Sequence, residues 1–515
     1  MKLLKFTYTG LLGLSLLTLA SCSDEKFTEI NTNPNLPSKV STTSLLISAQ
    51  KQTMDAIRSE EINYRGAQLF AQYFSQNIYT DPSRYQIPTS YSDNFWIKSY
   101  KALNNLNEII KLNTDEATRI GVTANKAGTN TNQIAIARVL KSYLFHSLTD
   151  VFGDIPYESY GNKDPDFQAL QQSPDNLTPK YATQEKIYKD ILNELKQAAD
   201  TLFKYSSANT FGTSDNIYKG SNQKWYKFAN SLRLRLATRI ALKDAALSRT
   251  HIESALAQGV FTSNDDNAAF KYSSASPNEA PLYRATVIAN RKDFAVSNVI
   301  IDALKGIRGP FTAPDPRLAK YANPNASGVY NGQIYGLPLE AGQLFPESTI
   351  SLPGTIINAA SYAEVLQEYA EVQFLISEYK NWDQTAYANG VKASLTKWGV
   401  NETDAAAYLS ALPAASKQNV LTQKYLALYN QGIESWSEIR RTGYPLFLIK
   451  SGDLLWTGLV GGVTKTYYFT PEVGQTIPNR LVYPIIEQNT NKANYQDALK
   501  SQGDDVITNK IWWNK

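Results

Sequence analysis

Cys22 is the side chain of this 515-residue sequence whose position points most clearly to a covalent reaction. It directly follows Leu19-Ala20-Ser21, and residues 11–20 form an apolar run that two lysines precede. A positive start, an apolar run about half as long as the roughly 20 residues of a membrane span, and small residues at the cut describe a secretory signal. A cysteine at that cut makes the signal a lipobox, in which the thiol is acylated before cleavage. We therefore predict a signal peptide over residues 1–21 and lipidation of Cys22.

The other reactive side chains form no recognised catalytic or metal-binding pattern. Only two histidines occur: His251 lacks the second histidine of a zinc protease helix, and His146 lies within an apolar helical pattern. The sequence has no nucleophile elbow, phosphate-binding loop, dinucleotide-binding glycine triplet or helix-loop-helix calcium loop. We therefore predict no catalytic residue, no metal ligand and no cofactor.

Close pairs of aspartates leave one enzymatic alternative open. Glycoside hydrolysis needs only two carboxylates at a suitable separation, so the absence of a motif does not exclude it. The pairs are Asp164 with Asp166, Asp265 with Asp266, and Asp504 with Asp505. Because such pairs on polar loops are usually solvated, binding without catalysis is the prediction and a surface glycosidase is the alternative.

The composition favours a binding protein whose ligand is not a nucleic acid. Without residues 1–21 the chain has 49 basic and 47 acidic side chains, and a net charge near +2 gives no long-range attraction to nucleic acid. Cys22 is the only cysteine, so no disulfide forms within the chain. There are 32 tyrosines and 8 tryptophans, whose flat apolar faces and polar edges suit both core packing and amphipathic ligands.

Helical periodicity is the main structural signal. Apolar residues recur at helical spacing, and small residues stand where paired helices would cross, which suggests stacked helical hairpins of the tetratricopeptide kind. The predicted fold class is therefore all-α, with minor short strands at 446–449 and 464–469. The predicted helices run from near Ser44 to Ile57, and through Trp96–Ile110, Ile136–Leu148, Ile187–Leu202, Trp225–Ile240, Val365–Tyr379 and Leu421–Trp436.

Long irregular insertions separate the helices and are the natural place for a ligand. The largest cover residues 205–222, about 262–360 and 444–480, and are rich in Gly, Pro, Asn and Ser. In a helical stack each pair buries its apolar stripe against the next, which leaves such insertions free for binding. No linker divides the chain, so we predict a lipidated tether over residues 22–38 and one domain over 39–515.

Blocks of sequence along nearly the whole chain follow the order found in a known family. They are Phe27–Asn35, Ala137–Tyr157, Trp225–Arg235, Asp315–Arg317, Glu371–Leu375, Gln423–Tyr425, Trp436–Pro445, Ile477–Arg480, Tyr483–Pro484 and Ile511–Trp513. These blocks resemble the SusD/RagB nutrient-binding outer-membrane lipoproteins of Bacteroidetes, in particular the SusD-like branch. Ser23-Asp24-Glu25 is similar to the signal that exports such lipoproteins to the cell surface.

The resemblance implies both a location and a partner. It implies a tetratricopeptide scaffold that is lipid-anchored in the outer membrane at the cell surface and lies over a SusC-like TonB-dependent transporter. Relatives present oligosaccharides, and in some members peptides, to that transporter. Capture of an oligosaccharide is the prediction, capture of a peptide or glycopeptide is the alternative, and an envelope scaffold that binds no small ligand is a third class.

Most residues of these blocks are better explained by packing than by ligand contact. Trp225 and Phe228 belong to an apolar helical stripe, and Arg317 is expected to pair locally with a carboxylate or with helix-end carbonyls. In the family, the loop after the first helix and the central insertions form the ligand surface. Aromatic rings there pack against sugar faces, and polar groups serve the hydroxyls. The residues that this resemblance nominates for ligand binding are Tyr79, Arg84, Tyr85, Tyr91, Trp96, Tyr272, Tyr283 and Arg284.

Overall fold

Residues 40–515, apart from 124–127, 172 and 174–175, are described by a computed structural model of the chain. The predicted signal peptide, the lipidation of Cys22 and the tether over 22–38 lie outside the described residues. Residues Thr42–Lys515 form one compact unit. Among the described residues, no helix is long and apolar enough to cross a membrane.

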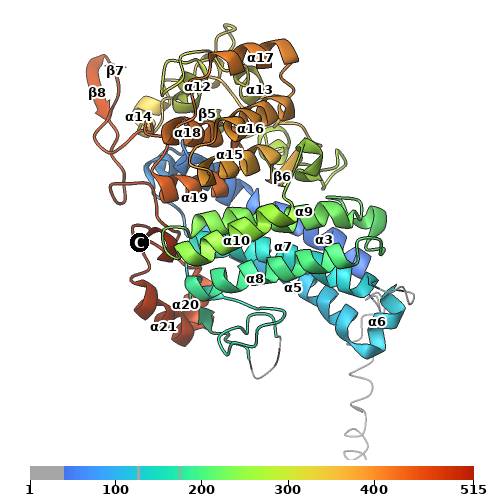
Figure 1. Ribbon diagram of the computed structural model, residues 1–515. Coiled ribbons are helices and arrows are strands. Elements are labelled where there is room, and N and C mark those ends of the chain that lie inside the picture. The colour runs from blue at the N-terminus through green and yellow to red at the C-terminus, as the bar shows by residue number, and fades with distance from the viewer. Residues whose placement is uncertain (1–39, 124–127, 172, 174–175) are drawn as a thin grey trace, which may run out of the picture. The chain divides into compact units, whose positions relative to one another are not determined.

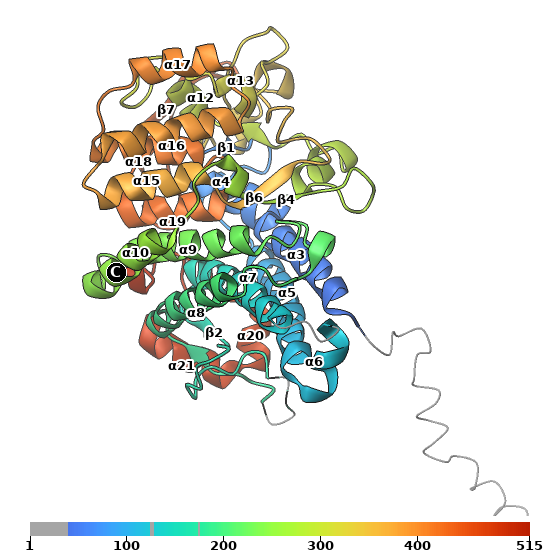
Figure 2. The same ribbon diagram turned by 45° about the vertical axis from the view of Figure 1, so that its right-hand side comes forward.

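Helices that pack side by side in sequence order build the first part of this unit. α3 packs along α5, α5 along α7, α7 along α8, α8 along α9, and α9 along α10, and Figures 1 and 2 show them as blue, cyan and green layers. Side-chain caps start several of them, because a hydroxyl or carboxylate accepts a free N–H of the first turn: Thr183 caps α8 and Ser221 caps α9. The bounds are α3 Thr42–Ile57, α5 Ser90–Thr114, α6 Glu116–Thr123, α7 Thr129–Phe152, α8 Gln184–Lys204, α9 Asn222–Arg239 and α10 Ala245–Gln258.

A second group of helices follows the central insertion. With both groups in place, the predicted helical fold class is confirmed. α15 packs on α16, on α18 and on α9, which joins the two groups, and α19 packs on the π-helix η1 (Glu60–Ala67) near the start of the chain. Figure 1 shows α15 to α19 in orange above α9, and α20 and α21 in dark red below it. The bounds are α15 Tyr369–Tyr379, α16 Gln384–Lys397, α17 Glu402–Ala411, α18 Lys417–Ala427, α19 Gly432–Thr442, α20 Ile485–Thr490 and α21 Lys492–Gln502.

Several predicted boundaries are wrong, each for a local reason. The predicted helix Leu421–Trp436 is two helices, α18 and α19, because Asn430 has a positive φ of 72° that a helix interior does not allow. Val365 lies in strand β6 (Ala363–Gln367), where it pairs with Ala269, and the helix begins only at Tyr369. The predicted strand over 446–449 is not formed, whereas 464–469 overlaps strand β8 (Val463–Tyr468).

The described residues contain four two-stranded antiparallel sheets. The pairing that matters most for function joins β1 to β5, because Phe74 lies opposite Val296 and so brings the first loop against the central insertion. In Figure 1 the β7–β8 hairpin stands apart from the neighbouring helices. The pairs are β1 Phe74–Ser75 with β5 Ala295–Val296, β2 Ile155–Pro156 with β3 Tyr181–Ala182, β4 Ala268–Lys271 with β6, and β7 Leu454–Val460 with β8.

Short helical turns fill the rest of the insertions, which are therefore less irregular than expected. They include α11 and the π-helix η5 next to each other in the central insertion. The bounds are α4 Gln68–Phe70, η2 Asp81–Arg84, η3 Gly212–Ser214, η4 Asn264–Asp266, α11 Pro281–Tyr283, η5 Arg284–Ile288, α12 Asn298–Leu304, α13 Leu318–Tyr321, α14 Leu339–Gly342, η6 Glu347–Thr349 and η7 Trp512–Asn514.

Large aromatic side chains fill the core between the helices. Trp225 and Phe228 are fully buried, which confirms the predicted packing role of the α9 stripe. Arg317 is also buried and pairs with Asp315, both with at most 1% of the side chain exposed, as its local sequence predicted. At about 25 cal/mol per Å² of apolar surface, burial of one large aromatic side chain contributes several kcal/mol to folding.

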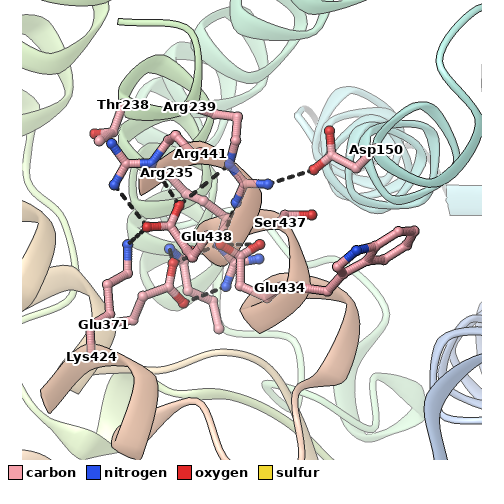
Figure 3. Close-up of polar contacts among 12 residues, drawn as sticks. Asp150, Arg235, Thr238, Arg239, Glu371, Lys424, Glu434, Ser437, Glu438 and Arg441 are labelled. Atoms are coloured by element: carbon pink, nitrogen blue, oxygen red, sulfur yellow. Dashed lines mark hydrogen bonds and ion pairs between the residues drawn. The ribbon is translucent and has the colours of Figure 1, made fainter. Parts of the chain in front are cut away.

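Buried ion pairs join α7, α9, α15, α18 and α19 (Figure 3). Arg239 of α9 lies 2.8 Å from Asp150 of α7 and also pairs with Glu434 of α19. Burial acts to raise the pKa of Glu438, but Arg441 and other nearby cations outweigh it and hold that pKa well below its usual range. Any other packing of the five helices that separated these pairs would leave a costly unpaired buried charge.

Candidate functional site

Two adjoining clefts lie where the first loop meets the central insertion. Both have Ala289 in their walls. The first, called the tyrosine cleft below, has a volume of about 510 Å³ and is lined by Arg65, Ile78, Tyr79, Ala289, Asn290, Arg291, Lys292 and Asp293. The second, called the acidic cleft, has a volume of about 440 Å³ and is lined by Asp55, Ser59, Glu60, Glu61, Lys98, Glu279, Pro281, Arg284, Ala285 and Ala289. Volumes of roughly 300–1,000 Å³ are usual for small-molecule sites.

The β1–β5 pairing positions the tyrosine cleft. Residues 76–79 follow β1 and residues 289–293 precede β5, so the two sides of the cleft start from one small sheet. A hydrogen bond of 3.1 Å from Gln76 Nε2 to Asp293 Oδ2 joins them beyond the strands. The third side is η1, which begins where the Ser59 hydroxyl accepts the N–H of Ile62.

Tyr79 is the aromatic side chain that this cleft exposes. It is 63% exposed, and its backbone has a φ of +56°. Asn290, in the same wall of residues, has a φ of +50°. Left-handed backbone is uncommon outside glycine and costs of order 1–3 kcal/mol, so it persists where the surrounding structure enforces it. Two such residues in one cleft single it out as a functional candidate.

Two arginines beside Tyr79 are held in place by carboxylates. Arg291 donates to Asp293 at 2.7 Å and pairs with Glu60, and Arg65 also donates to Glu60, at 3.3 Å. The hydrogen bond with Asp293 is the main cause that raises the pKa of Arg291 above its usual value. Both guanidinium groups are therefore fixed before any ligand arrives, and that of Arg291 lies 6.0 Å from the centre of the Tyr79 ring.

Four carboxylates give the acidic cleft its character: Asp55, Glu60, Glu61 and Glu279. Glu279 is only 5% exposed, and its Oε2 atom is buried without a hydrogen-bond partner among the described residues. Asp55 accepts a hydrogen bond of 2.9 Å from the phenol of Tyr272, which fixes its orientation. The cleft thus presents oriented acceptors to any ligand that enters it.

Of the eight predicted ligand residues, Tyr79 and Arg284 line the two clefts. Tyr91 and Tyr272 are buried, and each contacts a residue of the cleft walls: Tyr91 contacts Arg65 and Tyr272 contacts Asp55. The ring of Tyr91 lies 5.1 Å from the guanidinium carbon of Arg65, and burial raises the pKa of Tyr91 to about 12. Tyr91 belongs to helix α5 and not to the loop in which the sequence placed it. Tyr283 is half-buried against the core beside Arg284.

The other three predicted residues lie in packed surroundings outside the two clefts. Arg84 is 8% exposed and donates to Glu472 at 2.9 Å and to Thr80 at 2.7 Å. Tyr85 is 1% exposed and Trp96 is 5% exposed. The ring of Tyr85 packs on Phe70 and Phe469, and that of Trp96 packs on Phe152, Tyr100, Tyr181 and Tyr483. These three residues therefore have a packing role in this region. Contact between a ligand and any of the eight predicted residues stays a prediction.

Sequence reasoning missed the charged residues that shape both clefts. Arg65 and Glu60 belong to a π-helix that the sequence did not predict, and Glu279 is a lone acid in a polar segment. The one usable signal was the polar run Asn290-Arg291-Lys292-Asp293 inside the central insertion. A run of that kind between apolar segments indicates an exposed loop, but it does not reveal what lies opposite.

Other hollows and charge clusters are weaker candidates. A third cleft of about 550 Å³ has no aromatic side chain in its walls, which are Asn323, Pro324, Asn325, Ala326, Pro346, Glu347, Ser348, Ile350 and Leu352. The ion-pair network of Figure 3 is buried, so its charges serve the helix packing. In the described part of the chain, no group of three or more His, Cys, Asp or Glu side chains is placed to hold a metal ion.

The family of the chain follows from matches that cover nearly all of it. A SusD-like family model described as "Starch-binding associating with outer membrane" matches residues 34–456. The chain belongs to the SusD-like family. A second model, described as "Susd and RagB outer membrane lipoprotein", matches residues 413–514. Membership in this SusD/RagB family confirms the predicted resemblance and makes the protein a nutrient-binding protein of the outer membrane.

Solved structures of SusD-like proteins share the fold. One described as a chitin-binding protein is 24% identical, with a TM-score of 0.74 over 92% of this chain and 100% of that chain. A chitin-binding SusD homologue from Flavobacterium johnsoniae is 22% identical, with a TM-score of 0.71 over 91% of this chain and 98% of that one. A SusD homologue from Parabacteroides distasonis is 20% identical, with a TM-score of 0.75 over 92% and 98%. A comparison with the curated proteins finds no match.

Proposed function

We propose that this SusD-like protein captures oligosaccharides in the tyrosine cleft at the cell surface and delivers them to a SusC-like TonB-dependent transporter of the outer membrane. The observation that carries the proposal is Tyr79, an exposed ring held by left-handed backbone above a cleft with fixed arginines. A ring in that position packs against the apolar face of a sugar. The remaining polar groups of the cleft can then bond its hydroxyls.

Order in the cleft before binding favours capture. Glu60 and Asp293 hold the two arginines, so a ligand need not order these side chains when it binds. Arg65 Nε is buried and has no hydrogen-bond partner among the described residues, so it is an unsatisfied donor. Sugar hydroxyls and ring oxygens are suitable acceptors.

Two related observations support sugar as the cargo class. Two of the structures with the same fold are described as chitin-binding proteins, and the matching family model is described as starch-binding. Export through the signal peptide and lipidation of Cys22 are part of the proposal, because they place the cleft outside the cell.

Calorimetry of a soluble chain that begins at Ser23 tests the cargo. The titrants are oligomers of N-acetylglucosamine, oligomers of glucose and a peptide pool. Saturable heat with one class of oligosaccharide, without product release on chromatography, is the expected result. Heat with peptides alone would reassign the cargo, and release of shortened sugars would indicate the glycosidase alternative.

Purification of the full-length lipoprotein from outer membranes in mild detergent tests the partner. The expected result is co-purification of a TonB-dependent β-barrel in equal amount. A Cys22→Ser chain, which is secreted without its lipid, is the control. Isolation of the lipoprotein without any barrel would contradict the delivery step and leave the capture step to be judged by calorimetry.

A further inference from the structure

The acidic cleft adjoins the tyrosine cleft but has a different chemistry. We propose that it binds a primary ammonium group of the captured oligosaccharide, with the Glu279 carboxylate as the group that receives it. The ligand class is then an amino-sugar oligosaccharide that carries at least one free amine. This inference rests on the proposed function, because it assumes that a neighbouring sugar occupies the tyrosine cleft.

Glu279 differs from the other three carboxylates of the acidic cleft. Each of the others already has a basic partner, and Asp55 has Tyr272 as well: the pairs are Asp55 with Lys51, Glu60 with Arg65 and Arg291, and Glu61 with Lys98. Glu279 is only 5% exposed, yet its Oε2 has no partner within the described part of the chain. A buried carboxylate without a counter-charge is costly, so the Glu279 carboxylate is destabilised until a ligand donates a hydrogen bond to it.

The basic groups of the acidic cleft leave this carboxylate available. Arg284 donates from Nη1 to the backbone carbonyl of Pro277 at 3.0 Å. Lys98 lies 3.8 Å from Glu61. Neither contact satisfies Oε2 of Glu279, and a ligand that carries its own cation supplies the missing charge.

An organic ammonium group fits this site better than a metal ion. Among the described residues, no group of three or more potential ligands is placed to hold a metal, and three of the four carboxylates are occupied by cationic side chains. An ammonium group has three donors and needs fewer carboxylates. The Ser59 hydroxyl, which lines the same cleft, offers an additional acceptor.

The shared wall at Ala289 links the two clefts into one site for two neighbouring sugar units. One unit packs on Tyr79, and the amine of the other reaches Glu279. The prediction is therefore selectivity by amine content: an oligomer of glucosamine, with free amines, binds more tightly than the N-acetylated oligomer of the same length.

The test titrates the soluble chain with glucosamine hexamer and with N-acetylglucosamine hexamer. We expect the unaltered chain to bind the free-amine hexamer at least about tenfold more tightly. Glu279→Gln should bring the ratio of the two affinities close to one, while Glu116→Gln, which alters an exposed glutamate outside the clefts, should leave the ratio as it was. The comparison of ligands on the unaltered chain stands even if the Glu279 variant fails to fold.

Each other outcome overturns the inference in a recognisable way. Binding of N-acetylated or glucose oligomers without preference for amines overturns it and leaves the proposed function intact. A preference that survives in Glu279→Gln assigns the amine to another group. Binding of lysine-containing peptides with no response to either hexamer overturns both this inference and the proposed sugar cargo.

Discussion

The guanidinium carbon of Arg291 lies 6.0 Å from the centre of the Tyr79 ring, although the two residues come from distant parts of the sequence. The β1–β5 sheet brings their segments together, and ion pairs with Asp293 and Glu60 hold the arginine in place. An arginine near an aromatic ring stabilises the ring's position through a cation–π interaction. The exposed ring of Tyr79 is thus a positioned part of the site and not a loose surface residue.

Replacement of Tyr79 by alanine should weaken capture of the sugar. Loss of the ring removes the apolar platform, and we expect affinity to fall at least about tenfold, which corresponds to about 1.4 kcal/mol. Calorimetry with the oligosaccharide that the unaltered chain binds is the measurement. Tyr468→Ala is the matched control, because Tyr468 is 56% exposed on the β7–β8 hairpin outside both clefts. Equal losses in both variants would argue against a specific platform at Tyr79.

The buried ion pairs predict a large loss of stability when one acid is neutralised. Glu434→Gln leaves Arg235 and Arg239 buried with one counter-charge fewer, and we expect the free energy of unfolding to fall by about 3–5 kcal/mol. Urea unfolding at pH 7 measures it. Asp497→Asn breaks a pair with Lys500 in which both side chains are mostly exposed, and it should cost less than about 1 kcal/mol. A change of that small size in Glu434→Gln would show that the network does not hold the helices.

Asp266 gives a pH-dependent prediction. Burial alone raises the pKa of Asp266, but hydrogen bonds from Lys227 and Thr262 outweigh it and leave that pKa below its usual value. Because the pKa is lower in the folded chain, this carboxylate stabilises the fold above the unfolded pKa of about 4, and the contribution is lost as the pH falls through the folded pKa. Asp266→Asn should therefore lower the free energy of unfolding by roughly 1 kcal/mol at pH 7 and by progressively less below about pH 4.

Urea unfolding at several pH values between 2 and 7 compares the unaltered chain with this variant. The exposed neighbour Asp265 provides the control, since Asp265→Asn removes a carboxylate to which the described residues supply no comparable set of donors. A deficit in Asp266→Asn that stays constant down to pH 2 would mean that the carboxylate charge is not its source.

We predict that lipidation of Cys22 anchors the chain in the membrane. Cys22→Ser should abolish incorporation of labelled palmitate and release the chain from the membrane fraction, because the thiol is the acylated group. Metabolic labelling followed by fractionation measures both effects. Ser21→Ala keeps a small residue at the cut and should leave both unchanged. Label retained by Cys22→Ser would place the lipid elsewhere.

The sequence predicted the helices well where one apolar stripe covers a long segment, as for Trp225 and Phe228 in α9. It predicted the individual ligand residues less well, because an aromatic residue in polar sequence can face either the core or the solvent. Tyr85 and Trp96 are enclosed by rings from distant segments, whereas Tyr79 is not. Contacts between distant segments decide whether such a residue is buried, as the rings of Phe469 and Tyr483 do for Tyr85 and Trp96. Periodicity within one segment carries no information about these contacts.

Hydrogen exchange with and without ligand tests the central claim most directly. The soluble chain is saturated with the hexamer, of N-acetylglucosamine or of glucose, that gives saturable heat, and amide exchange is followed by mass spectrometry. Our account predicts slower exchange in residues 76–79 and 289–293, on the two sides of the tyrosine cleft. Protection confined to other segments, such as 323–326 and 346–352 around the third cleft, would contradict it, and so would a failure of both hexamers to bind.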